Sequence, residues 1–178
     1  MEKLFEGAEA QIFEVNCDVL KKVRLEKNYR LPQIDDKLRK SRTRREFKVL
    51  TKLFDSEVNV PEPLKLLDKE FSFEMSNIKG DVLKAVLNKK LLFDGFHEMI
   101  KMHNLNITHG DLTTLNMIAF ENDVYLIDFG LAEFSKKIED KAVDLNLFFT
   151  CIRNEHPDYF KFKEELLDMY MKSVEKGK

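Results

Sequence analysis

Cysteine is nearly absent from the 178-residue sequence, which has two, and glycine and proline are scarce, at six and four. Cys17 and Cys151 lie far apart and show no C-x-x-C or Cys/His spacing, which argues against a disulfide scaffold and a zinc cluster. With so little glycine and proline, no stretch looks like an interdomain linker, and no repeat or low-complexity run is present. We therefore expect one domain over residues 1–178.

Long hydrophobic runs are also missing, since none approaches the roughly 18 residues typical of a membrane helix. The N-terminus, Met1–Glu6, lacks the apolar core of a secretion signal. A hydrophobic fraction of 43% is ordinary for a folded protein and argues against wholesale disorder. Together with cysteine usage that suits a reducing compartment, these features predict a cytoplasmic protein that makes no contact with a membrane.

The sequence has no large excess of one charge, since 30 basic and 32 acidic residues give a net charge of −2. The distribution is uneven, because twelve basic and four acidic residues between Leu20 and Lys48 give that segment +8. Either this is a solvated helix face, or it contacts a polyanion such as RNA. Four of its residues do not belong to an apolar stripe and are expected to face outward: Arg39, Lys40, Arg42 and Arg44.

Hydrophobic periodicity predicts strands in the first part of the chain and helices in the second. Strands are expected over residues 11–15, 18–24, 64–67 and 71–75, and one long helix over 34–54. Later helices are expected over 82–87, 91–106, 141–149 and 159–174, interrupted by a hairpin of residues 116–120 and 124–128. This order predicts an α+β fold with a strand-rich N-lobe of about residues 1–76, a hinge of about 77–80 and a small, mostly helical C-lobe of about 81–178.

Three oxygen-bearing side chains are expected to meet at one end of this hairpin. Asn116 opens one strand and Asp128 closes its antiparallel partner, so the pairing brings both to the same end. Asp111 lies on the loop that leads there. Asn and Asp oxygens suit Mg²⁺, which takes further ligands from water and phosphates. Any one of these residues could be a simple turn former, but the joint spacing is much rarer.

The stretch His109-Gly110-Asp111-Leu112 with Asn116, followed by Asp128-Phe129-Gly130, resembles the protein-kinase-like superfamily, whose signatures are H-R-D-L-x-x-x-N and D-F-G. The resemblance implies that Asp111 positions or deprotonates the nucleophile and that Asn116 and Asp128 hold the metal of Mg-ATP. Gly110 departs from the pattern. It replaces the Arg that usually ties catalysis to activation-loop phosphorylation, so we expect no such switch.

The superfamily also implies a phosphate-contacting Lys on an early strand, paired with a Glu from the following helix. Lys22 is our choice, and Lys21 remains the alternative because sequence alone does not fix strand register. Glu46 shares a helical stripe with apolar residues, so it should point toward the core, where a carboxylate needs a cationic partner. A Lys22–Glu46 pair is therefore predicted.

The remaining nucleotide contacts are assigned by position. Gly7-Ala8-Glu9-Ala10 is a weak match to a phosphate-covering loop, since it has one glycine where the superfamily motif has three. Ile118 and Ile127 would form an apolar floor under adenine, although core packing explains them equally well. Backbone groups near Glu74 and Met75 would meet the edge of the base.

Further fragments narrow the resemblance: residues 7–10, Lys27-Asn28-Tyr29-Arg30, Arg42-Thr43-Arg44-Arg45-Glu46 and 139–145. With His109–Thr114 they resemble the small atypical kinases of the KEOPS complex, the PRPK-like family, over nearly the whole chain. Two departures are Glu26, where we expect Pro, and Leu115, where the family often has Ser.

This resemblance implies a Mg-ATP-dependent atypical serine/threonine kinase and ATPase. It also implies partnership with a tRNA threonylcarbamoyltransferase subunit and other KEOPS subunits, in a complex that makes N6-threonylcarbamoyladenosine in tRNA. Some members are fused behind the transferase, so both a standalone subunit and an excised domain are open. The resemblance also implies that Asp144 braces the catalytic loop, while His109 is expected to be a structural brace.

Basic residues are expected to contact tRNA within the complex, namely the +8 segment and the tail Lys172, Lys176 and Lys178. Two other functions stay open. A small-molecule phosphotransferase of the aminoglycoside or choline kinase type uses similar motifs, but few residues follow Gly130 to bind its substrate. A scaffold that retains only the fold would have no need to keep Lys22, Glu46, Asp111, Asn116 and Asp128 together.

Overall fold

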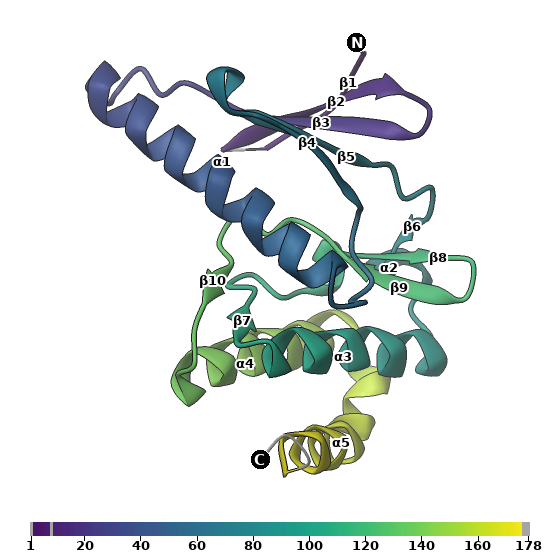
Figure 1. Cartoon of the computed structure of the whole chain (residues 1–178). Coiled ribbons are helices and arrows are strands. Elements are labelled where there is room, and N and C mark those ends of the chain that lie inside the picture. The colour runs from purple at the N-terminus through teal and green to yellow at the C-terminus, as the bar shows by residue number, and fades with distance from the viewer. Residues whose placement is uncertain (1, 8, 176–178) are drawn as a thin grey trace.

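The structure, a computed structural model, describes residues 2–7 and 9–175 and has a sheet above a helical layer (Figure 1). The N-lobe sheet consists of β1 (Glu2–Glu6), β2 (Ala10–Asn16), β3 (Val19–Arg24), β4 (Pro63–Leu67) and β5 (Ser72–Ser76). Its order is β1-β2-β3-β5-β4, with every pair antiparallel. Strand β1 was not predicted, because all five of its residues are exposed and give no buried face to detect.

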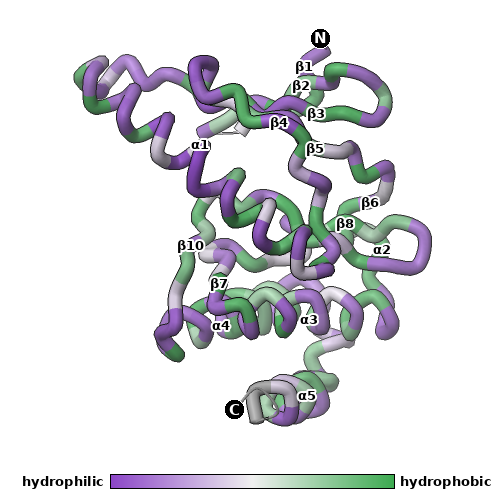
Figure 2. Tube along the Cα trace, in the orientation of Figure 1, coloured by the Kyte–Doolittle hydropathy of each residue, from purple (hydrophilic) through white to green (hydrophobic). Residues whose placement is uncertain are grey.

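The long helix α1 (Pro32–Phe54) crosses beside the sheet (Figure 1). Its proline lies in the first turn, where a missing N–H costs no helical hydrogen bond. Figure 2 shows mainly hydrophilic residues in the first half of α1 and more hydrophobic ones toward Phe54. Val49, Leu50 and Leu53 are accordingly buried in the core. The second half is therefore anchored by apolar packing, and the first half depends on polar contacts.

The C-lobe combines helices with two small sheets. Its helices are α2 (Leu83–Val86), α3 (Lys89–Asn104), α4 (Ile138–Glu155) and α5 (Lys163–Glu175), and its strands are β6 (Asp81–Val82), β7 (Ile107–Thr108), β8 (Met117–Phe120), β9 (Asp123–Leu126) and β10 (Glu133–Phe134). Short 3-10 turns occupy Asp68–Glu70, Thr114–Asn116 and Pro157–Phe162. Strands β6, β8 and β9 form one sheet and β7 pairs with β10. The α+β prediction is confirmed, although α4 is longer at both ends than the predicted 141–149.

Aromatic side chains fill the core between α3, α4 and α5. The ring of Phe96 lies 5.5 Å from that of Phe148, 5.7 Å from that of Phe149 and 6.4 Å from that of Tyr170, measured between centroids. Rings at these separations contribute about 0.5–1.5 kcal/mol per pair beyond the area they bury. This packing fixes α5 against α3, below the loop that carries Asp111.

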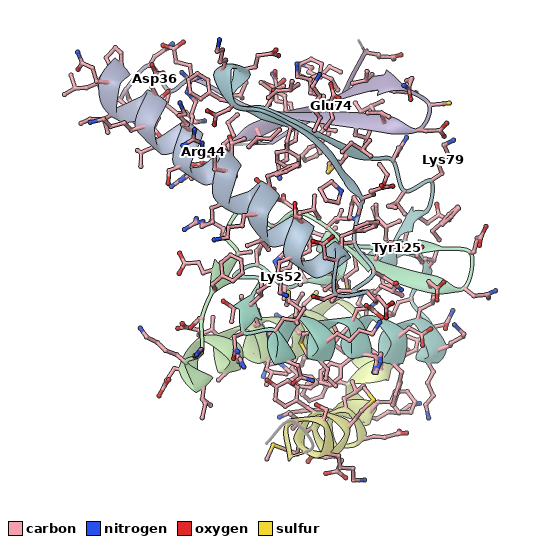
Figure 3. All side chains as sticks on the ribbon, in the orientation of Figure 1. Asp36, Arg44, Lys52, Glu74, Lys79 and Tyr125 are labelled. Carbon is pink, nitrogen blue, oxygen red and sulfur yellow. The ribbon has the colours of Figure 1, made fainter. Side chains whose placement is uncertain are left out.

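The basic segment is largely neutralised within the fold. Arg39, expected to face outward, is only 14% exposed because it pairs with Asp35 and Asp36 and stacks 4.1 Å from the ring centroid of Phe71. That expectation was wrong for Arg39, since an aromatic ring supplied an apolar partner from outside the helix. Arg44 binds Asp68 through two nitrogens and is 54% exposed; Figure 3 labels it on α1 with Asp36.

The rest of the predicted polyanion surface is only partly described. Lys40 also pairs with Asp68. Arg42 pairs with Glu9 and is partly buried, so the expectation that it faces outward was wrong as well. Lys176 and Lys178 lie outside the described residues. Within the described part of the chain, no helix combines the length and the apolarity that crossing a membrane requires.

Candidate active site

A cavity of about 490 Å³ lies between the N-lobe sheet and the β8–β9 hairpin. Of the residues expected around adenine, Met75, Ile118 and Ile127 line it. Glu74 does not line it. In the register of the sheet, Glu74 of β5 lies opposite Lys21 of β3 and Lys65 of β4, and Figure 3 shows it on the sheet. The wall continues instead with Ser76 and Asn77, and Leu20 and Leu115 add apolar surface that the sequence analysis did not assign. The cavity thus has apolar walls above and below.

Lys22 projects from β3 into this cavity and meets Glu46 of α1. Its Nζ lies 2.6 Å from Oε1 of Glu46 and 2.7 Å from Oδ1 of Asp128. Lys21 points to the other face, as alternation along a strand requires, and its Nζ lies 2.5 Å from Glu70. The predicted Lys22–Glu46 pair is confirmed, and the register question is answered in favour of Lys22.

Burial alone would lower the pKa of Lys22, but the charges of Glu46 and Asp128 outweigh burial and raise that pKa above its usual value. Lys22 is therefore charged at neutral pH. Arg24, two residues along the same strand, lies 2.5 Å from the other oxygen of Glu46. Glu46 is thus shared by two buried cations. Arg24 was not among the predicted site residues, although its spacing from Lys22 places it on the same face of β3.

Asp128 ends the hairpin in a left-handed conformation, with φ of 61°. This conformation is uncommon for a residue other than glycine and is often found at functional sites. Burial opposes ionisation, but Lys22 and the Gly130 N–H hold the pKa of Asp128 below its usual value. The side chain is therefore a carboxylate, held against Lys22 at the edge of the cavity.

Asn116 lies at the same end of the hairpin, as predicted. Its backbone carbonyl accepts a 3.0 Å hydrogen bond from the N–H of Ile127, the residue before Asp128. The side-chain nitrogen of Asn116 donates to the carbonyl of Asp111 at 2.7 Å and to its carboxylate at 2.9 Å. These bonds leave the amide oxygen of Asn116 available as a ligand, and they fix Asp111 beside it.

The donor set fits a divalent cation that is also bound by phosphate. The described residues contain no group of three or more His, Cys, Asp or Glu able to hold a metal alone. A carboxylate from Asp128 and an amide oxygen from Asn116 are hard oxygen ligands of the kind Mg²⁺ uses with phosphates and water. The two residues therefore fit a nucleotide-dependent Mg²⁺ site and not a closed protein cage.

The loop that carries Asp111 is held from below by Asp144 of α4. The oxygens of Asp144 accept hydrogen bonds from the N–H of His109 at 2.6 Å and of Gly110 at 2.8 Å. Its Oδ2 also lies 3.1 Å from Nε2 of His103, whose Nδ1 lies 3.0 Å from the Tyr170 hydroxyl. The predicted brace is confirmed. It extends to Tyr170 on α5, a contact that was not predicted from the sequence.

His109 braces the loop with its ring, as expected. Its Nδ1 accepts a 3.3 Å hydrogen bond from the N–H of Asp111, and its Nε2 lies 3.0 Å from the carbonyl of Ile127. Complete burial lowers the pKa of His109, so the neutral ring is favoured. One imidazole therefore links the Asp111 loop to the strand that ends in Asp128.

Gly110 occupies a position that a side chain would not fit. Its φ is +82°, and an added Cβ would lie 2.8 Å from the carbonyl oxygen of Leu131. Both the backbone conformation and this close approach require glycine. An Arg at this place, as in the superfamily pattern, would push the segment after Gly130 away.

A second cavity, of about 290 Å³, shares Lys22 and Asp128 with the first and is also lined by Asp111. Gly7, Glu9 and Ala10 line it, and the N–H of Gly7 bonds to the carbonyl of Ala10 at 2.9 Å to close a turn. Ala8, also predicted to cover phosphates, lies outside the described residues. Asp111 and Gly130 complete the opposite wall. The loop and the candidate nucleophile-positioning residue thus share one cavity.

Comparison with known sequences identifies relatives over most of the chain. A RIO domain matches residues 11–133. The KEOPS complex subunit Bud32 of Pyrococcus abyssi is 39% identical, over 96% of this chain and 86% of that protein. The EKC/KEOPS complex subunit BUD32 of Enterocytozoon bieneusi is 38% identical, over 86% and 83%. A probable bifunctional tRNA threonylcarbamoyladenosine biosynthesis protein of Methanocorpusculum labreanum is 40% identical over 87% of this chain but only 29% of its own length.

Solved structures show the same fold. The Rio2 kinase from Chaetomium thermophilum matches with a TM-score of 0.70 at 12% identity, over 99% of this chain and 72% of the kinase. Its ADP/Mg²⁺-phosphoaspartate complex matches with a TM-score of 0.66 at 13% identity, over 99% and 71%. The ADP-bound aminoglycoside phosphotransferase APH(2'')-Ib matches at 0.69 and 16% identity, over 99% and 80%. At these identities the likeness shows the fold alone, and it confirms the two-lobed kinase-like prediction.

Proposed function

This chain belongs to the RIO-domain family, and we propose that it is a Mg-ATP-dependent subunit of a KEOPS-type complex, with ATPase and serine/threonine kinase activity. The observation that carries the proposal is the group formed by Lys22, Glu46 and Asp128 at the mouth of an apolar cavity. Names of relatives that refer to KEOPS and to threonylcarbamoyladenosine support the complex and the pathway. A Rio2 structure with ADP and Mg²⁺ supports the ligand.

The large cavity would hold the nucleoside, with its base between Leu20 and Ile127. Lys22 would exchange Asp128 for phosphate oxygens. Glu46 would keep Lys22 positively charged with either second partner. Asp128 and Asn116 would hold Mg²⁺. When bound, that ion would polarise the terminal phosphoryl group and neutralise charge that develops on it.

Asp111 would orient the attacking water or hydroxyl group and accept its proton. Its carboxylate is positioned by the Asn116 amide, and its backbone by His109. A group of this kind acts mainly in the transition state, so its removal should lower kcat more than nucleotide affinity.

We further propose that residues 1–178 form one kinase-like domain whose hinge is Asn77–Gly80. Gly80 is tightly packed, since an added Cβ would lie 2.1 Å from the carbonyl oxygen of Ala119. The segment therefore runs directly against β8, where only glycine fits. Lys79 of the same segment pairs with Asp18 at 2.6 Å and ties the hinge to the β2–β3 turn; Figure 3 labels Lys79 there.

The decisive experiment compares Asp128→Ala with Asp123→Ala, an exposed carboxylate on the same hairpin. We expect folded Asp128→Ala protein to lose ATP hydrolysis and Mg²⁺-dependent ATP binding, while Asp123→Ala retains both. Asp111→Asn should keep near-normal ATP binding and lose about 100-fold or more in kcat. Undiminished hydrolysis by folded Asp128→Ala protein would reject the assignment and favour the scaffold alternative.

The role in the complex requires a separate measurement. ATP turnover by the chain should change when its transferase partner and tRNA are added. We also propose that tRNA contact involves the exposed Lys37 and Lys40 of α1. Reversing both charges should weaken tRNA binding by the assembled complex in a salt-dependent way. If subunit association fails while tRNA binding by the remaining assembly is unchanged, this surface binds protein and not RNA.

A further inference from the structure

Three charged side chains beside the Asp111 loop have no role in the scheme above: Arg24 of β3, Arg42 of α1 and Glu9 of the Gly7–Ala10 loop. All three line the smaller cavity, together with Asp111 and Gly130. Arg42 lies one helical turn before Glu46, so both residues project from the same face of α1 toward the cleft. The smaller cavity is therefore positively charged on the wall that faces Asp111.

Glu9 is the carboxylate that these arginines bind. It forms an ion pair with Arg42, and its oxygens lie 3.9 Å from Arg24 and 3.7 Å from Arg30. Although partial burial opposes it, the hydrogen bond from Arg42 and the charges of the arginines hold the pKa of Glu9 below its usual value. Glu9 is an anion held by three guanidinium groups.

The cations exceed what Glu9 can satisfy. Arg24 is 5% exposed and bonds Glu46 through one terminal nitrogen, while its Nε finds no hydrogen-bond partner among the described residues. A buried guanidinium with an unsatisfied N–H favours an additional anion. Glu9, at 46% exposed, sits on a surface loop and can leave without disturbing the core.

We propose that Arg24 and Arg42 form a subsite for inorganic phosphate, distinct from the nucleotide phosphates at Lys22, and that Glu9 occupies this subsite until phosphate displaces it. The inference rests on the proposed ATP hydrolysis. There, water attacks the terminal phosphorus, the bond to the bridging oxygen of ADP breaks, and the proton of water passes through Asp111 to solvent. The phosphate that forms lies next to the cavity lined by Arg24, Arg42 and Asp111.

Phosphate fits this place better than a carboxylate ligand does. Planar guanidinium groups bind phosphate through paired hydrogen bonds, and two of them on adjacent elements match its tetrahedral oxygens. The native carboxylate at the site shows that the arginines accept an oxyanion. Release of phosphate would then depend on the return of Glu9.

The test measures binding of inorganic phosphate to the full chain saturated with Mg-ADP, by equilibrium dialysis with labelled phosphate. Arg42→Gln should weaken phosphate binding about tenfold, the loss expected for one charge-assisted hydrogen bond. Glu9→Gln should strengthen binding several-fold, because it removes the competing charge and keeps the size of the side chain. Arg44→Gln is the matched control, since Arg44 lies on the same helix but binds Asp68 outside both cavities.

The opposite signs of the two variants distinguish a ligand site from a structural clasp. If Glu9→Gln and Arg42→Gln both weaken phosphate binding, or neither changes it, the pair only fastens the loop to α1 and the inference is wrong. Mg-ADP binding is measured in the same samples. If the wild-type chain does not bind Mg-ADP, the proposed function fails; if Mg-ADP binds and only the phosphate result is negative, the function stands and the subsite does not.

Discussion

The two sides of the cleft hold their functional groups by different means. On the N-lobe side, Lys22, Arg24 and Glu46 form ion pairs between β3 and α1, and Asp128, which Lys22 contacts across the cleft, is 54% exposed. On the C-lobe side, the loop of Asp111 is held through its backbone by Asp144, which is fully buried. The ion-paired side chains of the N-lobe can exchange partners, while Asp144 fixes a segment of the backbone.

This difference follows from what each side must do. In the proposed function, phosphate would replace a carboxylate next to Lys22 or Arg42, because a charged partner is exchanged for another of the same sign. The N–H groups of His109 and Gly110 both donate to the carboxylate of Asp144, a buried side chain, so the loop depends on this one acceptor. Changes at Asp144 should therefore alter stability, and changes at Lys22 and Glu46 should alter turnover.

The largest expected effect is that of Asp144→Ala. It leaves two backbone N–H groups and His103 without their acceptor, so we expect a loss of about 3–5 kcal/mol in the free energy of unfolding. Chemical denaturation measures it, with Glu139→Ala, an exposed acid on the same helix, as the control that changes stability by less than about 1 kcal/mol. A loss below about 1 kcal/mol for Asp144→Ala would show that the brace does not stabilise the fold.

Turnover should respond next, through the Lys22–Glu46 pair. Lys22→Met and Glu46→Gln should each lower turnover about 100-fold, and the double variant should cost little more, because both residues act through one contact to phosphate. Steady-state ATP hydrolysis on the four proteins gives the coupling. Additive losses would mean that Glu46 serves Arg24 and not Lys22, which would move the functional pair toward the smaller cavity.

How much the sequence predicted differs between the two sides. The Lys22–Glu46 pair and the meeting of Asn116 with Asp128 were predicted, because helical stripes and antiparallel pairing are local rules. The burial of Arg39 was missed, since its partner ring, Phe71, comes from a distant turn. Arg24 was missed because a basic residue beside Lys22 looked like part of a charged strand.

The link from Asp144 to Tyr170 shows the same limit more sharply. Asp144 was expected from the family resemblance, but the path through His103 joins three helices that are separated in the sequence. Only the packing of α5 on α3 brings the Tyr170 hydroxyl to the His103 ring. No periodicity in either segment predicts that contact, because apolar spacing indicates which face of a helix is buried and not which group a buried side chain meets.

A smaller effect is expected from Tyr170→Phe, which removes one hydrogen bond to His103 and no packing volume. The free energy of unfolding should fall by about 1 kcal/mol. If α5 also positions the Asp111 loop, the proposed ATP hydrolysis should show a kcat that is a few-fold lower at unchanged KM for ATP. Tyr125→Phe on the hairpin, labelled in Figure 3, serves as the control. Unchanged stability and kcat in Tyr170→Phe would confine the brace to α3 and α4.

Acidification should give the smallest effect, and it should separate the two sides. In the ion pair that joins the two sides, the pKa of Lys22 is raised above 10.5 and that of Asp128 is lowered below 3.8, with burial opposing both shifts and ion pairing outweighing it. The stabilisation from Lys22 is complete below pH 10.5, and that from Asp128 is lost only as the pH falls below 3.8. Neither group responds between pH 5 and pH 7, in about the range where an ordinary histidine titrates.

His109 does respond there, because burial lowers its pKa below the ordinary 6.5. The unfolded chain therefore binds a proton as the pH falls through 6.5 while the folded chain does not, so stability is complete above 6.5 and decreases as the pH falls toward the folded pKa. Protonation of Nδ1 would also remove the acceptor for the N–H of Asp111. We expect the denaturation midpoint of the wild type to decrease when the pH is lowered from 7 to 5. The midpoint of His109→Gln should decrease less. His156→Gln is the control for a partly buried histidine whose pKa is also lowered by burial. An equal fall in His109→Gln and wild type would place the pH response elsewhere and remove the distinction between the two sides of the cleft.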